Sequence, residues 1–255
     1  MKSKIRFFIP LSAICLSGAM LAIAPLHAAD TMDQPNSAVL RHPLHFLSTN
    51  DISAAVVLAP PPLAGSAEEA ADLDEVRAVY HAASAADKEA AYGEKKFTVF
   101  NFTEAVGPFF QSNSLPETVA FFHKVQLDAE TVTDLGKDYF RRPRPYRVDP
   151  SLANGKLEKS FSYPSGHSTE SMVLALVLAD LIPDKHDTII AHARLIGWHR
   201  VQIARHYPTD IYAGRMLARA IVRTMKENPE YQQEFAAAKA EIETVRTGAE
   251  PVMAK

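Results

Sequence analysis

The sequence predicts an all-α protein that folds as a compact, single-domain helical bundle. From residue 66 onward, apolar residues recur at the three- and four-residue spacing of amphipathic helices, and several prolines stand where helices begin. No segment shows the alternation of apolar and polar residues that predicts a strand. The 255 residues are 47% hydrophobic and 22% charged, which is a globular composition, and the formal net charge of -3 argues against a dedicated nucleic-acid-binding module.

Residues 1–28 have the pattern of a secretory signal peptide. Three basic residues among the first six precede an apolar stretch over residues 7–26, and small residues follow from Ala28. A permanent membrane anchor is the alternative, since about 20 apolar residues can span a bilayer, but two prolines and the small residues favour cleavage near Ala28. We therefore expect an exported, periplasmic protein. Cys15 is the only cysteine, so the mature chain would hold no disulfide, cysteine-based zinc site or thiol nucleophile.

Residues 29–255 are expected to form one domain. Residues 29–65 are interpreted as a proline-rich arm, because three consecutive prolines at 60–62 fix φ and remove backbone donors. Residues 66–255 are the helical core, and its longest apolar run, 172–179, is far too short to cross a membrane. The expected helical segments cover 66–97, 115–135, 168–181, 187–204, 208–225 and 229–246.

A basic segment follows the second of these helices. Lys137, Arg141, Arg142 and Arg144 lie within eight residues, among prolines that are expected to deny them a regular helix. Guanidinium groups match phosphate oxygens bidentately, and lysine adds a compact point charge. The segment therefore suits oxyanion binding, with a solvated basic loop as the alternative.

A second cluster stands directly before the buried helix predicted over 168–181. Backbone N–H groups at a helix start point toward a bound anion, Gly166 permits close approach, and Ser165 adds a hydroxyl donor beside His167. The alternative is an ordinary helix N-terminus that Ser165 caps, with His167 incidental.

A third cluster contains Arg200, His206 and Asp210, and Pro208 breaks the chain between two helices there. The break lets His206 and Asp210 face each other, so the carboxylate would fix the tautomer of the imidazole and leave its other nitrogen basic. Two simpler explanations stay open: Asp210 complements the helix dipole, and His206 is an interfacial histidine.

Together the clusters describe a phosphoryl-transfer site without a metal. Their spacing resembles the superfamily of bacterial class A nonspecific acid phosphatases, type 2 lipid phosphatases and vanadium haloperoxidases. The matching residues are Lys137 followed after six residues by Arg144-Pro145, then Pro164-Ser165-Gly166-His167, then Arg200, His206 and Asp210. The proline-rich arm is similar to the N-terminal segment of the class A enzymes.

The resemblance implies that residues 29–255 are an acid phosphatase domain that hydrolyses small-molecule phosphate monoesters. In the superfamily's mechanism His206 would form a phosphohistidine, His167 would protonate the leaving alcohol and Asp210 would orient His206. No metal or cofactor is expected, and vanadate should inhibit. The phosphate-binding set would be Lys137, Arg144, Ser165, Gly166 and Arg200.

Three other functions stay open: a secreted lipid phosphatase, a vanadium-dependent haloperoxidase, and a periplasmic anion-binding or helical interaction protein. His199 stands where the third motif usually has serine, which leaves substrate preference or the anchoring of Arg200 open. A homo-oligomer is compatible with exposed helical faces, but nothing in the sequence decides it.

Overall fold

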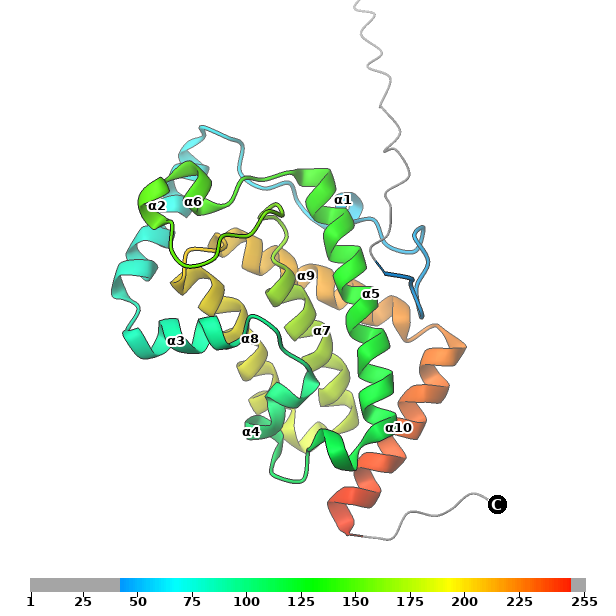
Figure 1. The fold of residues 1–255 in the computed structure, drawn as a ribbon. Helices are drawn as coiled ribbons and strands as arrows, with labels where there is room; N and C mark the ends of the chain where they lie inside the picture. Colours follow the sequence, from blue (N-terminus) through cyan, green and yellow to red (C-terminus); the bar gives the residue numbers. More distant parts are fainter. Residues whose placement is uncertain (1–41, 249–255) are drawn as a thin grey trace, which may run out of the picture. The chain divides into compact units, whose positions relative to one another are not determined.

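The computed structural model describes residues 42–248, all of which belong to one compact unit, residues 38–255. The predicted signal peptide, 1–28, lies outside the described residues. Every regular element within 42–248 is helical, so the all-α prediction is confirmed (Figure 1). The longer helices are α2 (Ala67–Ala82), α3 (Ala85–Gly93), α5 (Pro116–Phe140), α7 (Gly166–Leu181), α8 (His186–Gln202), α9 (Pro208–Met225) and α10 (Pro229–Thr247). The short ones are α1 (Ala54–Val57), α4 (Thr103–Val106) and α6 (Pro145–Val148), with 3-10 turns at Val99–Phe102, Ser112–Ser114, Pro150–Leu152 and Pro183–Lys185.

Helix α7 is the centre of the bundle. It packs against α5, α8 and α9, while α10 lies along α5 (Figure 1). Its residues are apolar on nearly all sides, and Val173, Leu174, Val177 and Leu178 are fully buried. A helix without a polar face is stable only when neighbours surround it, so this sequence forces the other helices to enclose α7.

The described part of the predicted arm packs into the core of the bundle, which the sequence did not indicate. Phe46 packs against the rings of Phe121 and Tyr231 in the core. The backbone N–H groups of His45, Phe46 and Leu47 all donate to the carboxylate of Asp128 on α5. One buried carboxylate thus satisfies these three backbone donors, and the segment needs no helical hydrogen bonds. This agrees with its lack of a helical sequence pattern.

The long helical segment predicted from residue 66 divides into two helices. Ser84 and Asp87 form a reciprocal capping box that begins α3 just after α2 ends. The change of direction lays α3 against α8, which places its C-terminal residue Glu94 beside His199.

The basic segment also differs from expectation at its start. Helix α5 continues to Phe140, so Lys137 lies on a regular helical turn, and the prediction that prolines keep all four cations out of a helix was wrong for this one. The helix ends because Arg141 adopts the left-handed conformation, with φ of 52°. Arg142 and Arg144 then follow in extended chain ahead of α6.

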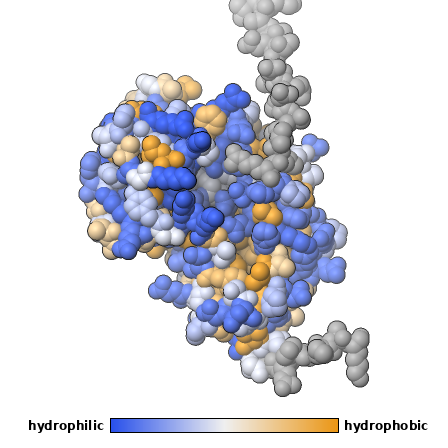
Figure 2. Space-filling view, in the orientation of Figure 1, coloured by the Kyte–Doolittle hydropathy of each residue, from blue (hydrophilic) through white to orange (hydrophobic). Residues whose placement is uncertain are grey.

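Hydrophilic residues dominate the face shown in Figure 2, and hydrophobic residues form smaller patches on it. Among the helices within 42–248, none is long and apolar enough to cross a bilayer.

Candidate active site

The three sequence clusters meet at the N-terminal end of α7. Lys137 comes from the last turn of α5, and a Cβ built on Gly166 would lie 3.0 Å from its Nζ. Arg144 Nη1 lies 3.1 Å from His206 Nε2, and His206 Nδ1 lies 3.3 Å from Asp210 Oδ2. The structure therefore brings residues from α5, α7, the end of α8 and the start of α9 into one site.

The contacts of His206 define its tautomer. A guanidinium has no acceptor, so Arg144 Nη1–H must donate to Nε2, which leaves the proton on Nδ1. Nδ1–H then donates to the Asp210 carboxylate. Burial, and next the positive charge of Arg144, lower the pKa of His206 well below its usual value. The imidazole is thus neutral, with a lone pair on Nε2.

Asp210 is fully buried and held by a dense set of donors. Arg142 Nη1 donates at 2.7 Å, the Ser162 hydroxyl at 2.5 Å and the backbone N–H of Tyr207 at 2.9 Å. The other arm of Arg142 pairs with buried Asp72 of α2 at 2.7 Å. A buried carboxylate requires such partners, and these residues hold Asp210 in place behind His206. Sequence reasoning missed Ser162 and Asp72, which carry no local signal, and did not assign Arg142 to the site.

At the start of α7 Gly166 lies close to two flexible side chains, which would have to shift to admit a larger residue there. A Cβ at position 166 would lie 3.0 Å from Lys137 Nζ and 3.3 Å from Glu170 Oε1. Ser165 is the N-cap: its hydroxyl accepts from the N–H of Ser168, and its own N–H donates to the Asp210 carbonyl. The positive end of the α7 dipole therefore faces the Lys137 ammonium region, an arrangement that favours a bound anion.

A carboxylate bridges the two arginines predicted to bind phosphate. Glu158 Oε2 lies 2.5 Å from Arg144 Nη2, and Glu158 Oε1 lies 2.6 Å from Arg200 Nη2. The arginines are only 1% and 3% exposed, whereas the Glu158 side chain is 33% exposed. Burial alone would raise the pKa of Glu158, but Arg144 and Arg200 hold it below the usual value. Glu158 thus occupies a position suited to a ligand oxyanion, and nothing in the sequence singled it out.

His167 lies on the opposite wall, beside Glu94. Because a carbonyl oxygen only accepts, His167 Nε2–H donates to the Glu94 carbonyl at 3.2 Å. Burial, then the charge of Arg200, lower the pKa of His167 well below its usual value. His199 does not contact Arg200 as an anchor: its Nδ1 lies 2.9 Å from both carboxylate oxygens of Glu94, and Arg200 is held by Glu158 and by the Ala91 carbonyl.

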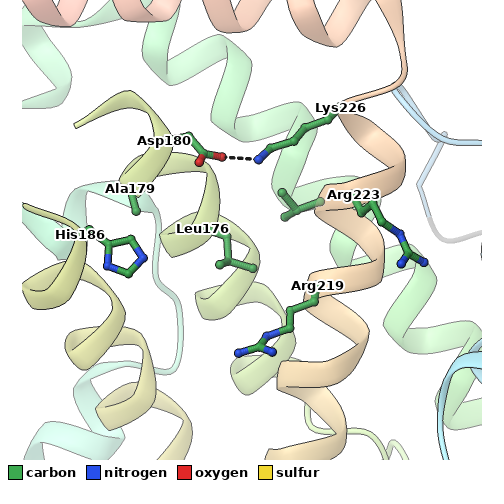
Figure 3. Close-up of a pocket in the computed structure, with 8 residues that line it drawn as sticks. Leu176, Ala179, Asp180, His186, Arg219, Arg223 and Lys226 are labelled. Carbon is green, nitrogen blue, oxygen red and sulfur yellow. Dashed lines mark ion pairs between the residues drawn. The ribbon is translucent and has the colours of Figure 1, made fainter. Parts of the chain in front are cut away.

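A cavity of about 390 Å³ opens beside Glu158 and Arg200 and is otherwise lined by Tyr92, Lys95, Lys156, Leu157, Lys159, Ile203 and Arg205. A cavity of similar size, about 430 Å³, lies toward the other end of α7 between α8 and α9. Figure 3 shows the ion pair between Asp180 and Lys226 there, with Arg223 pointing away from the other labelled residues. His186 lines this second cavity and pairs with exposed Asp187, whereas the first cavity is lined by Arg200 and Glu158, which contact the predicted site. Over residues 42–248, no group of three or more His, Cys, Asp or Glu side chains is arranged to hold a metal ion.

Comparison with known proteins agrees with this geometry. The PAP2 superfamily matches residues 125–233, a range that includes every site residue predicted from the sequence. Over these residues the chain is similar to the PAP2 superfamily. The resemblance found from three short motifs is therefore confirmed at the level of the superfamily.

Two curated relatives of this chain are acid phosphatases by name. A non-specific acid phosphatase of Providencia stuartii is 31% identical over 147 residues, covering 55% of this chain and 59% of the relative. An acid phosphatase of Zymomonas mobilis is 32% identical over 123 residues, covering 46% of this chain and 47% of the relative. The chain thus spans about half the length of these relatives. A solved transmembrane PAP2 type phosphatidylglycerolphosphate phosphatase of Bacillus subtilis aligns over 68% of this chain and 89% of its own, with 20% identity and a TM-score of 0.45.

Proposed function

We propose that this protein is a periplasmic acid phosphatase that hydrolyses phosphate monoesters through a phosphohistidine. The observation that carries the proposal is the environment of His206, whose unprotonated Nε2 lies 3.1 Å from a buried arginine while Asp210 holds the opposite nitrogen. A neutral, oriented imidazole beside fixed cations is what attack on a phosphoryl group needs. The superfamily and the names of the relatives support the same chemistry.

In the first step, His206 Nε2 forms a bond to phosphorus as the bond between phosphorus and the ester oxygen breaks. The leaving oxygen takes a proton from His167, and Asp210 stabilises the positive charge that develops on His206. In the second step His167, now neutral, takes a proton from the water that attacks phosphorus, the electron pair of the breaking N–P bond returns to His206 Nε2, and inorganic phosphate is released. Throughout, the equatorial oxygens lie against Lys137, Arg144, Arg200 and the N-terminal end of α7 at Ser165 and Gly166.

Substrate binding also requires Glu158 to leave the two arginines. Its carboxylate contacts the same guanidinium groups that would hold phosphate oxygens, so both cannot bind there at once. The residue belongs to a loop that includes Gly155 in the left-handed conformation and has no helical hydrogen bonds to break. The Glu158 carbonyl accepts from the side chains of Tyr146 and Arg147, so we expect the Glu158 side chain, a third of which is exposed, to rotate away while its backbone stays in place.

The decisive experiment is hydrolysis of p-nitrophenyl phosphate by the purified chain across pH, with a chelator present and His206→Ala in parallel. We expect chelator-resistant turnover that is highest at acidic pH and absent in the variant. A radiolabelled phosphoryl group should remain on wild-type protein after acid-free denaturation, since phosphohistidine is acid-labile. Turnover that survives in His206→Ala would show that another group attacks, and turnover abolished by the chelator would contradict a metal-independent mechanism.

Two further assays separate the other functions considered for this chain. Phosphatidic acid in mixed micelles, compared with soluble monoesters at equal phosphate concentration, tests for a lipid phosphatase. Bromide oxidation by the vanadate-treated protein with hydrogen peroxide tests for a haloperoxidase. A preference for the lipid, or halide oxidation without phosphatase activity, would replace the proposal. Detection of the mature N-terminus near residue 28 in a periplasmic extract tests the proposed location.

A further inference from the structure

We propose that His199 and Glu94 are positioning residues that hold His167 as the proton donor, and that they set the rate for substrates with weakly acidic leaving groups. The inference rests on the proposed phosphatase function and names Glu94, which lies outside the three superfamily motifs, together with His199. It also gives a role to His199, the residue that stands where serine is usual.

The first observation is the contact between His167 and the backbone of Glu94. The Glu94 carbonyl accepts from His167 Nε2–H at 3.2 Å, which leaves Nδ1 as the only ring nitrogen that can exchange a proton with substrate. If the His167 ring could rotate about its side-chain bonds, its Nδ1 would not stay at one position relative to the substrate. The carbonyl of Glu94 therefore fixes which nitrogen donates, as oriented histidines require.

The second observation is that the Glu94 side chain is fixed by His199. Both carboxylate oxygens lie 2.9 Å from His199 Nδ1, and the side chains are 15% and 7% exposed, so water competes little for the pair. Glu94 is the C-cap of α3 and lies where the chain leaves that helix. Beyond it the chain has no regular structure until the turn at Val99–Phe102. The hydrogen bond with His199 of α8 is thus the side-chain contact that holds this residue, and with it the carbonyl that His167 needs.

The two contacts form one chain from α8 to the proton donor: His199 to the Glu94 carboxylate, and the Glu94 carbonyl to His167. A serine at position 199 is too short to reach the carboxylate of Glu94 from the same backbone position. The longer histidine side chain does reach this carboxylate. The resulting contacts connect α8, α3 and the start of α7 at one wall of the site.

The consequence for the reaction depends on the leaving group. When the P–O bond breaks, its electron pair stays on the ester oxygen, which takes the proton from His167 Nδ1. An alkoxide is a poor leaving group until it is protonated, whereas p-nitrophenolate leaves readily without a proton. Disturbing the position of His167 should therefore slow alkyl phosphates much more than p-nitrophenyl phosphate, because general acid catalysis typically contributes about 10²–10⁴-fold.

The test compares kcat/KM for glycerol phosphate and p-nitrophenyl phosphate in the full chain and in His199→Ala, Glu94→Gln and the double variant. We expect His199→Ala and Glu94→Gln each to lower the alkyl-to-aryl ratio by about tenfold or more. The double variant should lower it no further than one single variant, because both act through the same contact. His199→Gln should recover part of the ratio, since its amide N–H can donate to the Glu94 carboxylate.

The matched control is His186→Ala. His186 also pairs with a neighbouring carboxylate on α8, Asp187 at 2.8 Å, but its side chain is 58% exposed and the pair lies outside the site. We expect an unchanged alkyl-to-aryl ratio there. Circular dichroism and thermal unfolding establish that each variant is folded before rates are compared.

Equal losses on both substrates, or an unchanged ratio in His199→Ala, would overturn the inference while leaving the proposed function intact. A wild-type protein that hydrolyses neither ester would overturn the proposed function itself, and the inference with it.

Discussion

Replacing Glu158 by glutamine should strengthen the binding of every ligand that uses Arg144 and Arg200. In the structure Glu158 bridges these arginines at 2.5 and 2.6 Å, so a ligand must first displace it. Glutamine keeps the size and one acceptor oxygen but removes the charge. The protein then spends more of its time with the arginines open, and the apparent Kd is the intrinsic Kd divided by the open fraction.

The magnitude follows from the contacts. Hydrogen bonds to charged groups are each worth about 1.5–3 kcal/mol, but the Glu158 side chain is 33% exposed, so solvation of the freed carboxylate returns much of this. A net difference of about 1.4 kcal/mol between closed and open states corresponds to roughly tenfold in binding. We expect KM for p-nitrophenyl phosphate to fall by about that factor with kcat nearly unchanged, because only ground-state access is altered.

The assay measures KM together with inhibition constants for inorganic phosphate and vanadate. Competition with one internal carboxylate predicts the same factor for all three ligands. Glu89→Gln, which removes an exposed acid of α3, controls for the change in net charge. A KM that rises, or that stays equal to wild type, would refute the displacement argument; a much larger gain for one ligand would show that Glu158 acts by direct contact with that ligand.

Five other outcomes follow from the same contacts. The rate should peak at acidic pH. His206 must be neutral to attack, so activity is lost as pH falls through the lowered pKa of His206. His167 must be protonated to donate, so activity is lost as pH rises through the lowered pKa of His167. A pH profile of kcat should keep its alkaline limb at higher pH than that of kcat/KM, since bound phosphate dianion raises the pKa of His167. Asp210→Asn should lower kcat by about 100-fold or more, because an amide no longer selects the Nδ1–H tautomer; normal single-turnover rates would contradict this. Asp72→Ala leaves a buried guanidinium without one of its two carboxylates and should lower the free energy of unfolding by about 3 kcal/mol, measured by urea denaturation. Burial raises the pKa of Glu170 to about 7. The contribution of Glu170 to stability is therefore complete below its pKa in the unfolded chain and is lost as pH rises through 7. The free energy of unfolding of Glu170→Gln should depend less on pH between these two pKa values, and a pH dependence identical to wild type would refute the burial argument.

The helices were predictable because their signals are local. Pro116, Pro208 and Pro229 begin helices as first-turn prolines, and the uniformly apolar α7 could only be a buried helix. The motif residues were equally visible, since their spacing is short and their chemistry distinctive. Local signals of this kind do not depend on knowing the tertiary structure.

The partners of those residues could not be predicted, because they come from far along the chain. Asp72 meets Arg142 across 70 positions, and Glu94 meets His199 across 105. A buried acid in an otherwise polar, exposed helix has no local pattern that separates it from its neighbours. The end of α5 was misplaced for a related reason: a left-handed Arg141, a conformation that most side chains disfavour, ends the helix.

A site built to bind a phosphate dianion conflicts with the stability of the empty protein. Arg144 and Arg200 are nearly inaccessible to water, and two unpaired buried guanidinium groups would cost several kcal/mol. A carboxylate fixed on a helix would pair with both arginines at all times, and it would also prevent the substrate from binding. Glu158 instead lies on a loop without regular structure, with a third of its side chain in solvent, so it compensates the arginines and still can be displaced. The placement of this acid on a loop is therefore what makes a stable empty site compatible with a site that binds phosphate.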